Sequence, residues 1–556
     1  MQKPSRVSRT SRTASHAGAV TGDASGISPM ATCPSSPTKR SPGNGTVPQS
    51  TSPTAGGTKT ADAPRVERRA SGPASACGCG PTLHARPSTN ASATKRPADE
   101  VPMAHPPYGR STPGGTGRHR SKVVLETKHA HRTLEHFRRL FGPMLRTMNV
   151  DATAGFSHAL LHRADGDRVA IVDGERTITY FALRADVARL KVALAAGGIA
   201  ERDRVVIFGE PSAFTISAYL AAMEAGGIAV PLGTSSTDAE LDAQLEAVAP
   251  RFAFLHEDVA ARFASLGWST GVEHVIVGPE PLRASNVSGE FERAPDDEDL
   301  IGIAAIFFAS SADDEVRAVH VGHDNLRANT EASICALSVR PGDRTVLMLP
   351  LADSFGASVL HSYLWVGGTL HIGPNPALPE RVVDAIESSR ATGFYGDADT
   401  YALLLDQGGL AERALPHLRY VAQAGGKLPE PLLDALIASA VPEVYLMYGQ
   451  AEATWLLSVV AAHTDPDKRA SVGRGLRGTT LTVLSPDGTA AAPSQIGDVV
   501  ATGPGVTRGY LDDLEASAER FRDGSLYTGD LGTLDEDGFV FLVEPPVEPP
   551  TEPPPD

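Results

Sequence analysis

From about residue 151 onward, short apolar segments alternate with longer segments of helical periodicity. The short segments are rich in β-branched residues and predict strands, whereas apolar residues three and four positions apart predict helices. Strands are predicted at residues 169–173, 178–180, 205–208, 228–232, 303–308, 345–349, 369–372, 418–422 and 444–447, and the first two helices at 181–196 and 212–225. This alternation is typical of parallel sheets covered by helices on both faces, so we expect an α/β fold.

The pattern differs at both ends of this region. Residues 1–120 are dominated by Ser, Thr, Pro, Gly, Ala and Arg and predict a disordered basic tail. An α/β core is expected from 121 to 470, beginning with a basic helical stretch, and 471–543 predicts a β-rich subdomain of short strands and turns. Residues 544–556, EPPVEPPTEPPPD, predict an extended Pro/Glu-rich tail.

Charge is distributed unevenly along the chain. The formal net charge is -16, yet residues 1–120 hold 16 Lys and Arg against 5 Asp and Glu. The acidic remainder argues against a nucleic-acid surface on the folded part. The Arg- and Ser-rich start also fits a transit peptide, although scattered prolines favour a flexible tail or a start codon placed too far upstream. No run of about 18 apolar residues exists, so we expect no membrane span.

Four cysteines are too few for a disulfide framework. Cys77 and Cys79 are separated by one residue and lack the two-residue spacing and second pair that are typical of a zinc site. Cys335 lies in an apolar helical pattern and is interpreted as a core residue. These features are most consistent with the cytoplasm.

A candidate site follows the last predicted strand of the core. The segment VYLMYGQAEATW, residues 444–455, places Tyr448-Gly449 after the strand, where we expect a loop, and Glu452 shortly after them. Ligands bind at the carboxyl ends of strands in open α/β sheets. The same pattern is also typical of a strand-to-helix turn whose Glu caps the helix. Motifs elsewhere in the chain are needed to distinguish the two interpretations.

Further motifs occur in a recognisable order. They include LPLADSFGAS at residues 349–358, LRYVAQAGGKLPEPLLDAL, SVGRGLRGTTLTVLSPDG, QIGDVVATGPGVTRGYL and LYTGDLGTLDEDGFVFLV. In this order and spacing, from about Met148 to Val543, they resemble the AMP-forming acyl/aryl-CoA ligases. These belong to the adenylate-forming superfamily, together with luciferases and peptide-synthetase adenylation domains.

The resemblance implies a fold and an activity. The expected fold has two helix-covered, mostly parallel sheets plus a smaller β-rich subdomain. The expected reaction uses ATP and magnesium to convert a small-molecule carboxylate into an acyl-adenylate, and most members then pass the acyl group to coenzyme A or to the phosphopantetheine of a carrier protein. AMP and ATP are therefore the implied nucleotides and magnesium the implied metal.

The resemblance also assigns roles to individual residues. Glu452 would hold magnesium on the phosphates and is a candidate catalytic residue, because a hard cation prefers oxygen ligands. Asp530, in YTGD, would accept hydrogen bonds from both ribose hydroxyls. Gly425-Gly426 and Tyr448-Gly449 would flank the adenine and the acyl group, because glycine lets the backbone approach a flat ring closely.

The phosphate loop departs from the family pattern. The family has a Ser/Thr/Gly-rich loop ending in Pro-Lys-Gly, whereas this chain reads ASSADDEVRA at residues 309–318. Arg317 stands at the position of the lysine and is a candidate catalytic residue, and Ser310 and Ser311 are candidate phosphate-binding hydroxyls. Glycines let backbone N–H groups converge on phosphate. One acid 4 Å from a phosphate charge would cost roughly 4 kcal/mol, or about a thousandfold in affinity.

Two further departures concern the lid and the acyl end. Glu544-Pro545 stand where the family has Gly-Arg before a small C-terminal domain that supplies a catalytic lysine, so that lid domain is expected to be absent. Asp353 replaces a histidine that faces the acyl carboxylate in many relatives, and Ala451 replaces a threonine beside the magnesium-binding acid. If Asp353 faces the pocket, it would favour a ligand with an amino group.

Three interpretations remain open at this point. The first is a carboxylate-activating ligase of reduced activity, with its C-terminal domain supplied by a separate polypeptide. The second is a catalytically silent module that binds an acyl group or an adenylate and interacts with a carrier protein or a partner enzyme. The third is a frameshifted gene, because an abrupt EPP repeat at a domain boundary is also typical of out-of-frame coding.

Overall fold

The computed structural model describes residues 155–268, 271–279, 283–286, 300–309, 315–439 and 441–543. The predicted basic tail, the helical stretch at 121–148 and the Pro/Glu-rich tail lie outside these residues. Ser310, Ser311 and the acids at positions 313 and 314 also lie outside them. All described residues belong to one compact unit.

The first sheet has seven strands. It is parallel except at its two edges, where β7 and β9 run antiparallel to their neighbours. In spatial order the strands are β7 (Arg283–Asn286), β6 (His274–Gly278), β5 (Phe252–His256), β3 (Arg204–Phe208), β4 (Ile228–Leu232), β8 (Ile303–Ala309) and β9 (Arg317–Gly322). Nearly every side chain of β3, β4 and β5 is buried, as expected for parallel strands covered on both faces.

A second strand layer consists of two adjoining parts. The four-stranded part runs β10 (Arg344–Leu347), β11 (Thr369–Ile372), β1 (Val169–Asp173), β2 (Arg176–Thr179), and the five-stranded part runs β12 (Gly393–Gly396), β13 (Tyr420–Gln423), β14 (Glu443–Gly449), β15 (Leu456–Ala461), β16 (Arg474–Gly475). The backbone N–H of Thr392 donates to the carbonyl of Arg344, which joins the two parts between β12 and β10.

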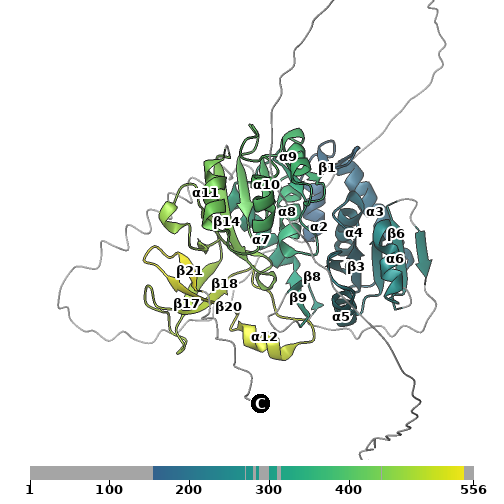
Figure 1. The fold of residues 1–556 in the computed structure, drawn as a ribbon. Helices are drawn as coiled ribbons and strands as arrows, with labels where there is room; N and C mark the ends of the chain where they lie inside the picture. The colour runs from purple at the N-terminus through teal and green to yellow at the C-terminus, as the bar shows by residue number, and fades with distance from the viewer. Residues whose placement is uncertain are drawn as a thin grey trace, which may run out of the picture. The chain divides into compact units, whose positions relative to one another are not determined.

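Helices lie between the strand layers and outside them. One core packs α2 (Phe156–His162), α3 (Tyr180–Ala196), α4 (Ala213–Glu224), α7 (His323–Leu337) and α8 (Ser354–Trp365) between both layers. The outer face of the first sheet is covered by α5 (Asp238–Val248) and α6 (Glu257–Ser265), and that of the second layer by α9 (Pro379–Ser388), α10 (Ala398–Asp406) and α11 (Glu430–Ala438). Figure 1 shows α3 and α4 beside β3, and α10 and α11 beside β14.

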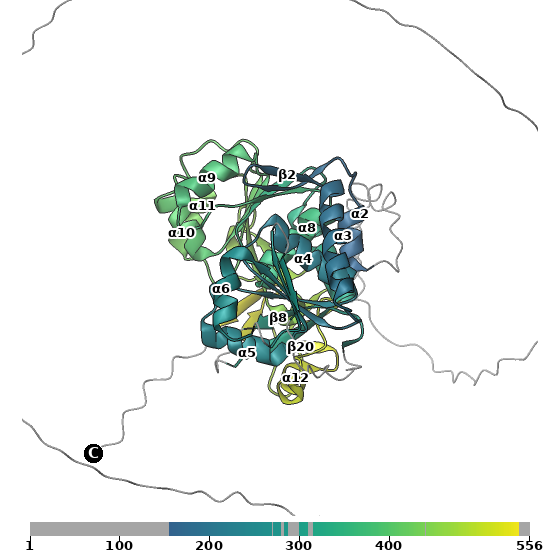
Figure 2. The same cartoon turned by 90° about the vertical axis from the view of Figure 1, so that its right-hand side faces the viewer.

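The C-terminal part of the described chain is a small antiparallel sheet. It contains β17 (Thr480–Leu484), β18 (Gly497–Thr502), β20 (Ser525–Leu534) and β19 (Phe521–Arg522), with β21 (Val540–Val543) paired to β20. The short helix α12 (Leu514–Arg520) precedes β19 and lies beside this sheet in both views (Figures 1 and 2). The α/β architecture with a smaller β-rich part is therefore confirmed.

Several predicted boundaries were wrong. Tyr448 and Gly449 were expected to break the strand, yet they form its last two residues because they pair with Ser458 and Leu456 of β15. Tyr180 was expected to end a strand, but it begins α3, where the Thr179 hydroxyl accepts a hydrogen bond from the Ala182 N–H as a helix cap. Arg317 was expected in a phosphate loop and is instead the first residue of β9.

The core also contains a histidine with a strongly altered pKa. His361 of α8 is 2% exposed, and its Nε2 lies 3.1 Å from the Tyr219 hydroxyl of α4. Burial lowers the pKa of His361 to about 3, because a charged imidazolium would lose its hydration there. The folded protein therefore keeps this histidine neutral in mild acid.

We expect acid to destabilise the protein through His361. Below the usual histidine pKa of 6.5 the unfolded chain binds a proton that the folded chain does not bind, so stability falls as the pH drops. This contribution is about 1.4 kcal/mol for each pH unit. His361→Gln keeps a polar group near Tyr219 and is expected to flatten the pH dependence of the urea midpoint. Equal slopes for variant and wild type would contradict this prediction.

Candidate nucleotide and acyl site

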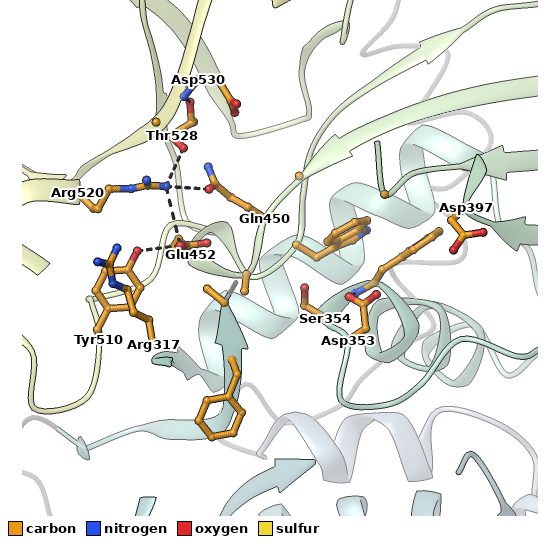
Figure 3. A pocket seen from close by; sticks show the side chains of 18 of the residues that line it. Arg317, Asp353, Ser354, Asp397, Gln450, Glu452, Tyr510, Arg520, Thr528 and Asp530 are labelled. Carbon is orange, nitrogen blue, oxygen red and sulfur yellow. Dashed lines mark hydrogen bonds and ion pairs between the residues drawn. The ribbon is translucent and has the colours of Figure 1, made fainter. Parts of the chain in front are cut away.

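Residues from both strand layers and the C-terminal sheet line one cavity of about 820 Å³. Figure 3 shows that its labelled side chains form two groups. Gln450, Glu452, Arg520, Thr528 and Asp530 lie at one end, and Asp353, Ser354 and Asp397 at the other. The cavity therefore has a mixed-charge end and an acidic end.

Glu452 lies at the centre of the mixed-charge end. It belongs to a single 3-10 turn, η2 (Ala451–Ala453), that directly follows β14, and it is only 6% exposed. Its Oε1 accepts a hydrogen bond from the Tyr510 hydroxyl at 2.8 Å and lies 3.9 Å from Nη2 of Arg520. Within the described part of the chain both side-chain contacts are made by the same oxygen, so Oε2 is available to a further ligand.

Pairing between two distant segments places Tyr510 beside Glu452. The segment at 509–511 lies along β9, where the His320 N–H donates to the Gly509 carbonyl and the Leu511 N–H to the Ala318 carbonyl. The Tyr510 N–H in turn donates to the hydroxyl of Ser517 in α12. Burial, together with the neighbouring negative charge of Glu452, raises the pKa of Tyr510, so its hydroxyl remains a donor at neutral pH.

Asp530 is held by a second tyrosine. The Tyr448 hydroxyl at the end of β14 donates to Oδ2 of Asp530 at 2.6 Å, and the Asp530 N–H donates to the Thr528 hydroxyl. Burial raises the pKa of Tyr448, and the charge of Asp530 adds to this effect. Two neighbouring residues of the predicted motif therefore have separate roles, since Tyr448 orients Asp530 while Gly449 lines the cavity.

Gly449 is required by the backbone of the β14–β15 hairpin. A Cβ at this position would collide with the carbonyl oxygen of Trp455 and lie 2.7 Å from its carbonyl carbon. The Gln450 N–H also donates to the Trp455 carbonyl at 2.9 Å. Glycine is therefore required at this position because the backbone of Trp455 approaches it closely.

Arg520 contacts both Glu452 and the turn that carries Asp530. Its Nη2 donates to the backbone carbonyl of Thr528 at 2.7 Å and to Oε1 of Gln450 at 3.1 Å, in addition to its ion pair with Glu452. Asp513 caps α12 by accepting from the Ala516 N–H, and Arg520 is the last residue of that helix. The side chain is thereby positioned between Glu452 and the turn that carries Asp530.

Arg317 approaches the same end from β9. Its guanidinium carbon lies 5.8 Å from the centre of the Tyr510 ring, and its Nη2 is 3.7 Å from a carboxylate oxygen of Glu315. The Glu315 side chain is 69% exposed, so this ion pair is weak. Of the three acids in the predicted phosphate loop, Glu315 alone lies among the described residues, and it forms an ion pair with Arg317.

The acidic end of the cavity combines two carboxylates with aromatic rings. Asp353 caps α8 by accepting from the Phe355 N–H at 2.9 Å, and Asp397 caps α10 by accepting from the Thr400 N–H at 2.7 Å. Asp353 is exposed at the cavity, yet partial desolvation by the surrounding protein raises its pKa. The charge of Asp397 adds a smaller effect in the same direction. The rings of Phe355 and Trp455 stack with centres 4.8 Å apart.

The structure brings together most of the predicted site residues that it describes. Arg317, Gly425, Gly449, Glu452 and Asp530 line the cavity, whereas Gly426 and Tyr448 are not among its lining residues. Gly425 has a φ of +79°, and a Cβ there would lie 3.5 Å from that of Asp397, so it lies at the acidic end. The expected approach of Gly425 to a ligand ring remains a prediction.

Several lining residues were not predicted from the sequence. Tyr510 lies within the quoted segment TRGYL, and Gln450 lies within the segment around Glu452, but neither carries a charge that would distinguish it. Arg520 ends the polar segment LEASAER, which resembles an ordinary exposed helix. No local pattern marks Arg520, because its contacts with Gln450 and Glu452 arise only in the folded chain.

Within the described part of the chain, no group of three or more His, Cys, Asp or Glu side chains is arranged to hold a metal ion. A magnesium ion at Glu452 would therefore need ligands from a substrate. The described helices include none with the length and apolar character needed to cross a bilayer.

Comparison with known proteins identifies the family. The model of the AMP-binding enzyme family matches residues 159–511. A 2-succinylbenzoate–CoA ligase of Geobacillus sp. (strain WCH70) is 27% identical over 383 residues, which are 68% of this chain and 74% of that protein. A 3-hydroxybenzoate–CoA ligase of Aromatoleum sp. (strain CIB) is 26% identical over 389 residues, or 67% and 73% of the two chains.

A solved structure agrees with this result at the level of the fold. The o-succinylbenzoate coenzyme A synthetase of Bacillus subtilis, in complex with ATP and magnesium, superposes with a TM-score of 0.61 at 23% identity. The match covers 70% of this chain and 79% of that one. Because the family model matches more than half of its length, this chain belongs to the AMP-binding enzyme family of adenylate-forming, acyl-CoA ligase-like proteins.

Proposed function

We propose that this protein binds ATP with magnesium in the cavity and activates a small-molecule carboxylate as an acyl-adenylate. The observation that carries the proposal is the placement of Glu452 and Asp530, 78 positions apart in sequence, at one end of one cavity. Asp530 would hold the ribose hydroxyls through its two oxygens, one of which already accepts from Tyr448. The acyl group would then lie toward Asp353 and Asp397.

The donor set at Glu452 fits magnesium. A magnesium ion is usually held by one or two carboxylates plus substrate phosphates, and Glu452 offers one buried carboxylate whose Oε2 is available. When bound, magnesium would supply positive charge to the phosphate oxygens. The residues of the chain have other roles, since Tyr510 orients the Glu452 carboxylate and Arg520 adds a fixed positive charge beside it.

The acyl substrate is proposed to be a carboxylate with an aromatic ring. The stacked rings of Phe355 and Trp455 offer a flat apolar wall in the cavity, and two relatives carry aromatic carboxylates in their names. Asp353 and Asp397 favour a ring that also bears an amino group, because their two carboxylates would repel a second negatively charged group on the substrate. A thiol such as coenzyme A or carrier-protein phosphopantetheine would accept the acyl group, with a separate C-terminal domain as a further proposed partner.

Hydroxamate formation and pyrophosphate release test this proposal. The full chain would be incubated with ATP, magnesium, hydroxylamine and one carboxylate from the set benzoate, 3-hydroxybenzoate, 2-succinylbenzoate, 3-aminobenzoate and phenylalanine. We expect product with at least one of them and more with 3-aminobenzoate than with benzoate. Absence of product with all five, from a chain that binds ATP, would contradict turnover and favour the second proposal below.

A second candidate function is binding without turnover. It is supported by the ion pair between Arg317 and Glu315, because Arg317 stands where the family has its phosphate-loop lysine and here meets an acid of the same segment. In that case the protein would hold an acyl group or an adenylate for a partner. Nucleotide binding with no pyrophosphate release would then be the expected pair of results.

A further inference from the structure

The mixed-charge end of the cavity contains hydrogen-bond donors that lack acceptors among the described residues. Nε of Arg520 and Nε2 of Gln450 are buried, and neither has an acceptor among the described residues. The two side chains also contact each other, since Nη2 of Arg520 donates to Oε1 of Gln450. Buried donors are normally satisfied, so two adjacent ones at a cavity point to a ligand that supplies acceptor oxygens.

We propose that Arg520 binds the phosphate nearest the ribose of the nucleotide and that Gln450 holds the guanidinium in position. This inference rests on the proposed function, which places the ribose at Asp530 and the metal-bound phosphates at Glu452. Arg520 lies between these two points, 2.7 Å from the Thr528 carbonyl and 3.9 Å from the Glu452 carboxylate. A guanidinium presents paired N–H groups to phosphate, and the buried Nε of Arg520 has no acceptor in the described part of the chain.

The charges around Arg520 are consistent with this role. The carboxylates of Glu452, Asp530 and the exposed Glu519 line the cavity around it. The guanidinium of Arg317 lies 5.8 Å from the centre of the Tyr510 ring. Without nucleotide, Arg520 offsets the buried charge of Glu452. With nucleotide, its free Nε donates to a phosphate oxygen while Nη2 keeps the Thr528 carbonyl. Arg520 would thus supply positive charge in a site whose phosphate loop is acidic in sequence.

A comparison of AMP with adenosine tests the inference. Binding of each ligand to the full chain would be measured by calorimetry for wild type, Arg520→Gln, Arg520→Lys and the control Arg522→Gln. Arg522 is exposed, lies two residues away and does not line the cavity. We expect Arg520→Gln to weaken AMP binding about ten- to a hundredfold and to leave adenosine binding unchanged, because only AMP carries the charged acceptor. Arg520→Lys is expected to recover part of the loss, and Arg522→Gln to bind like wild type.

Other outcomes would overturn the inference in distinguishable ways. If Arg520→Gln weakened AMP and adenosine equally, Arg520 would have only a structural role at the Thr528–Asp530 turn. If Arg520→Gln bound AMP with wild-type affinity, a contact between Arg520 and the phosphate would be excluded, whereas the proposal of nucleotide binding would stand. A wild-type chain that bound neither ligand would overturn the proposed function together with this inference.

Discussion

Glu452→Gln is expected to abolish the effect of magnesium on nucleotide binding and to lower acyl-adenylate formation by a factor of about 10²–10³. Within the described residues no multi-ligand metal cluster exists, so the single carboxylate of Glu452 carries the protein's contribution to metal binding. Glutamine is nearly isosteric, and its carbonyl oxygen can still accept from Tyr510. The variant therefore removes the charge without opening a cavity. The measurement is ATP affinity with and without magnesium, together with the rate of pyrophosphate release.

Glu515→Gln provides a matched control for this experiment. Glu515 is an exposed acid of α12 that does not line the cavity, so its neutralisation is expected to leave both quantities unchanged. A Glu452→Gln protein whose ATP binding was still strengthened by magnesium would show that the metal is held elsewhere. Equal losses for both variants would point to a general effect of net charge.

Gly449→Ala is expected to lower the stability of the protein by about 1–3 kcal/mol or more. The added Cβ would meet backbone atoms of Trp455 and Leu456, which can yield only if the β14–β15 hairpin separates. Because η2 follows directly, the same displacement would move Glu452 and weaken ATP binding. Urea-unfolding midpoints and ATP titrations on the same preparation would measure the two effects.

Gly155→Ala is a suitable comparison for the backbone effect. Gly155 has no atom within 4 Å of the position of an added Cβ, and its φ of -55° is accessible to alanine. This variant is expected to cost no more than about 1 kcal/mol, because Gly155 is the N-cap of α2 and alanine is a poorer N-cap than glycine. If Gly449→Ala matched Gly155→Ala in stability, the hairpin would be more yielding than its geometry indicates.

The parts of the fold that could be predicted are those in which local pattern and tertiary context agree. Strands β1, β4 and β11 have the predicted bounds because each is a compact apolar or β-branched run between turns. β5 was not predicted, since the short buried run FAFLH fits a strand or a helix equally well. The end of β14 was misplaced because pairing with β15 overrides the tendency of Tyr-Gly to form a turn.

The candidate site was predictable in its motif residues, which include Gly425 and Gly449 as well as the charged side chains. Glu452 and Asp530 stand in recognisable segments, and the structure places both at one cavity. Arg520 could not be assigned because its partners are the Thr528 carbonyl, Gln450 and Glu452, and these contacts arise only once α12 packs beside β20. Tyr510 likewise depends on the pairing of residues 509–511 with β9. Side-chain partners supplied by distant segments leave no local pattern.

Our proposal places a nucleotide and magnesium at the end of the cavity that contains Glu452 and Asp530. A calorimetric titration of the full chain with ATP, in the presence and absence of magnesium, tests it most directly. We expect saturable binding with one nucleotide per chain, and tighter binding when magnesium is present. No detectable heat of binding at millimolar ATP with magnesium would contradict it.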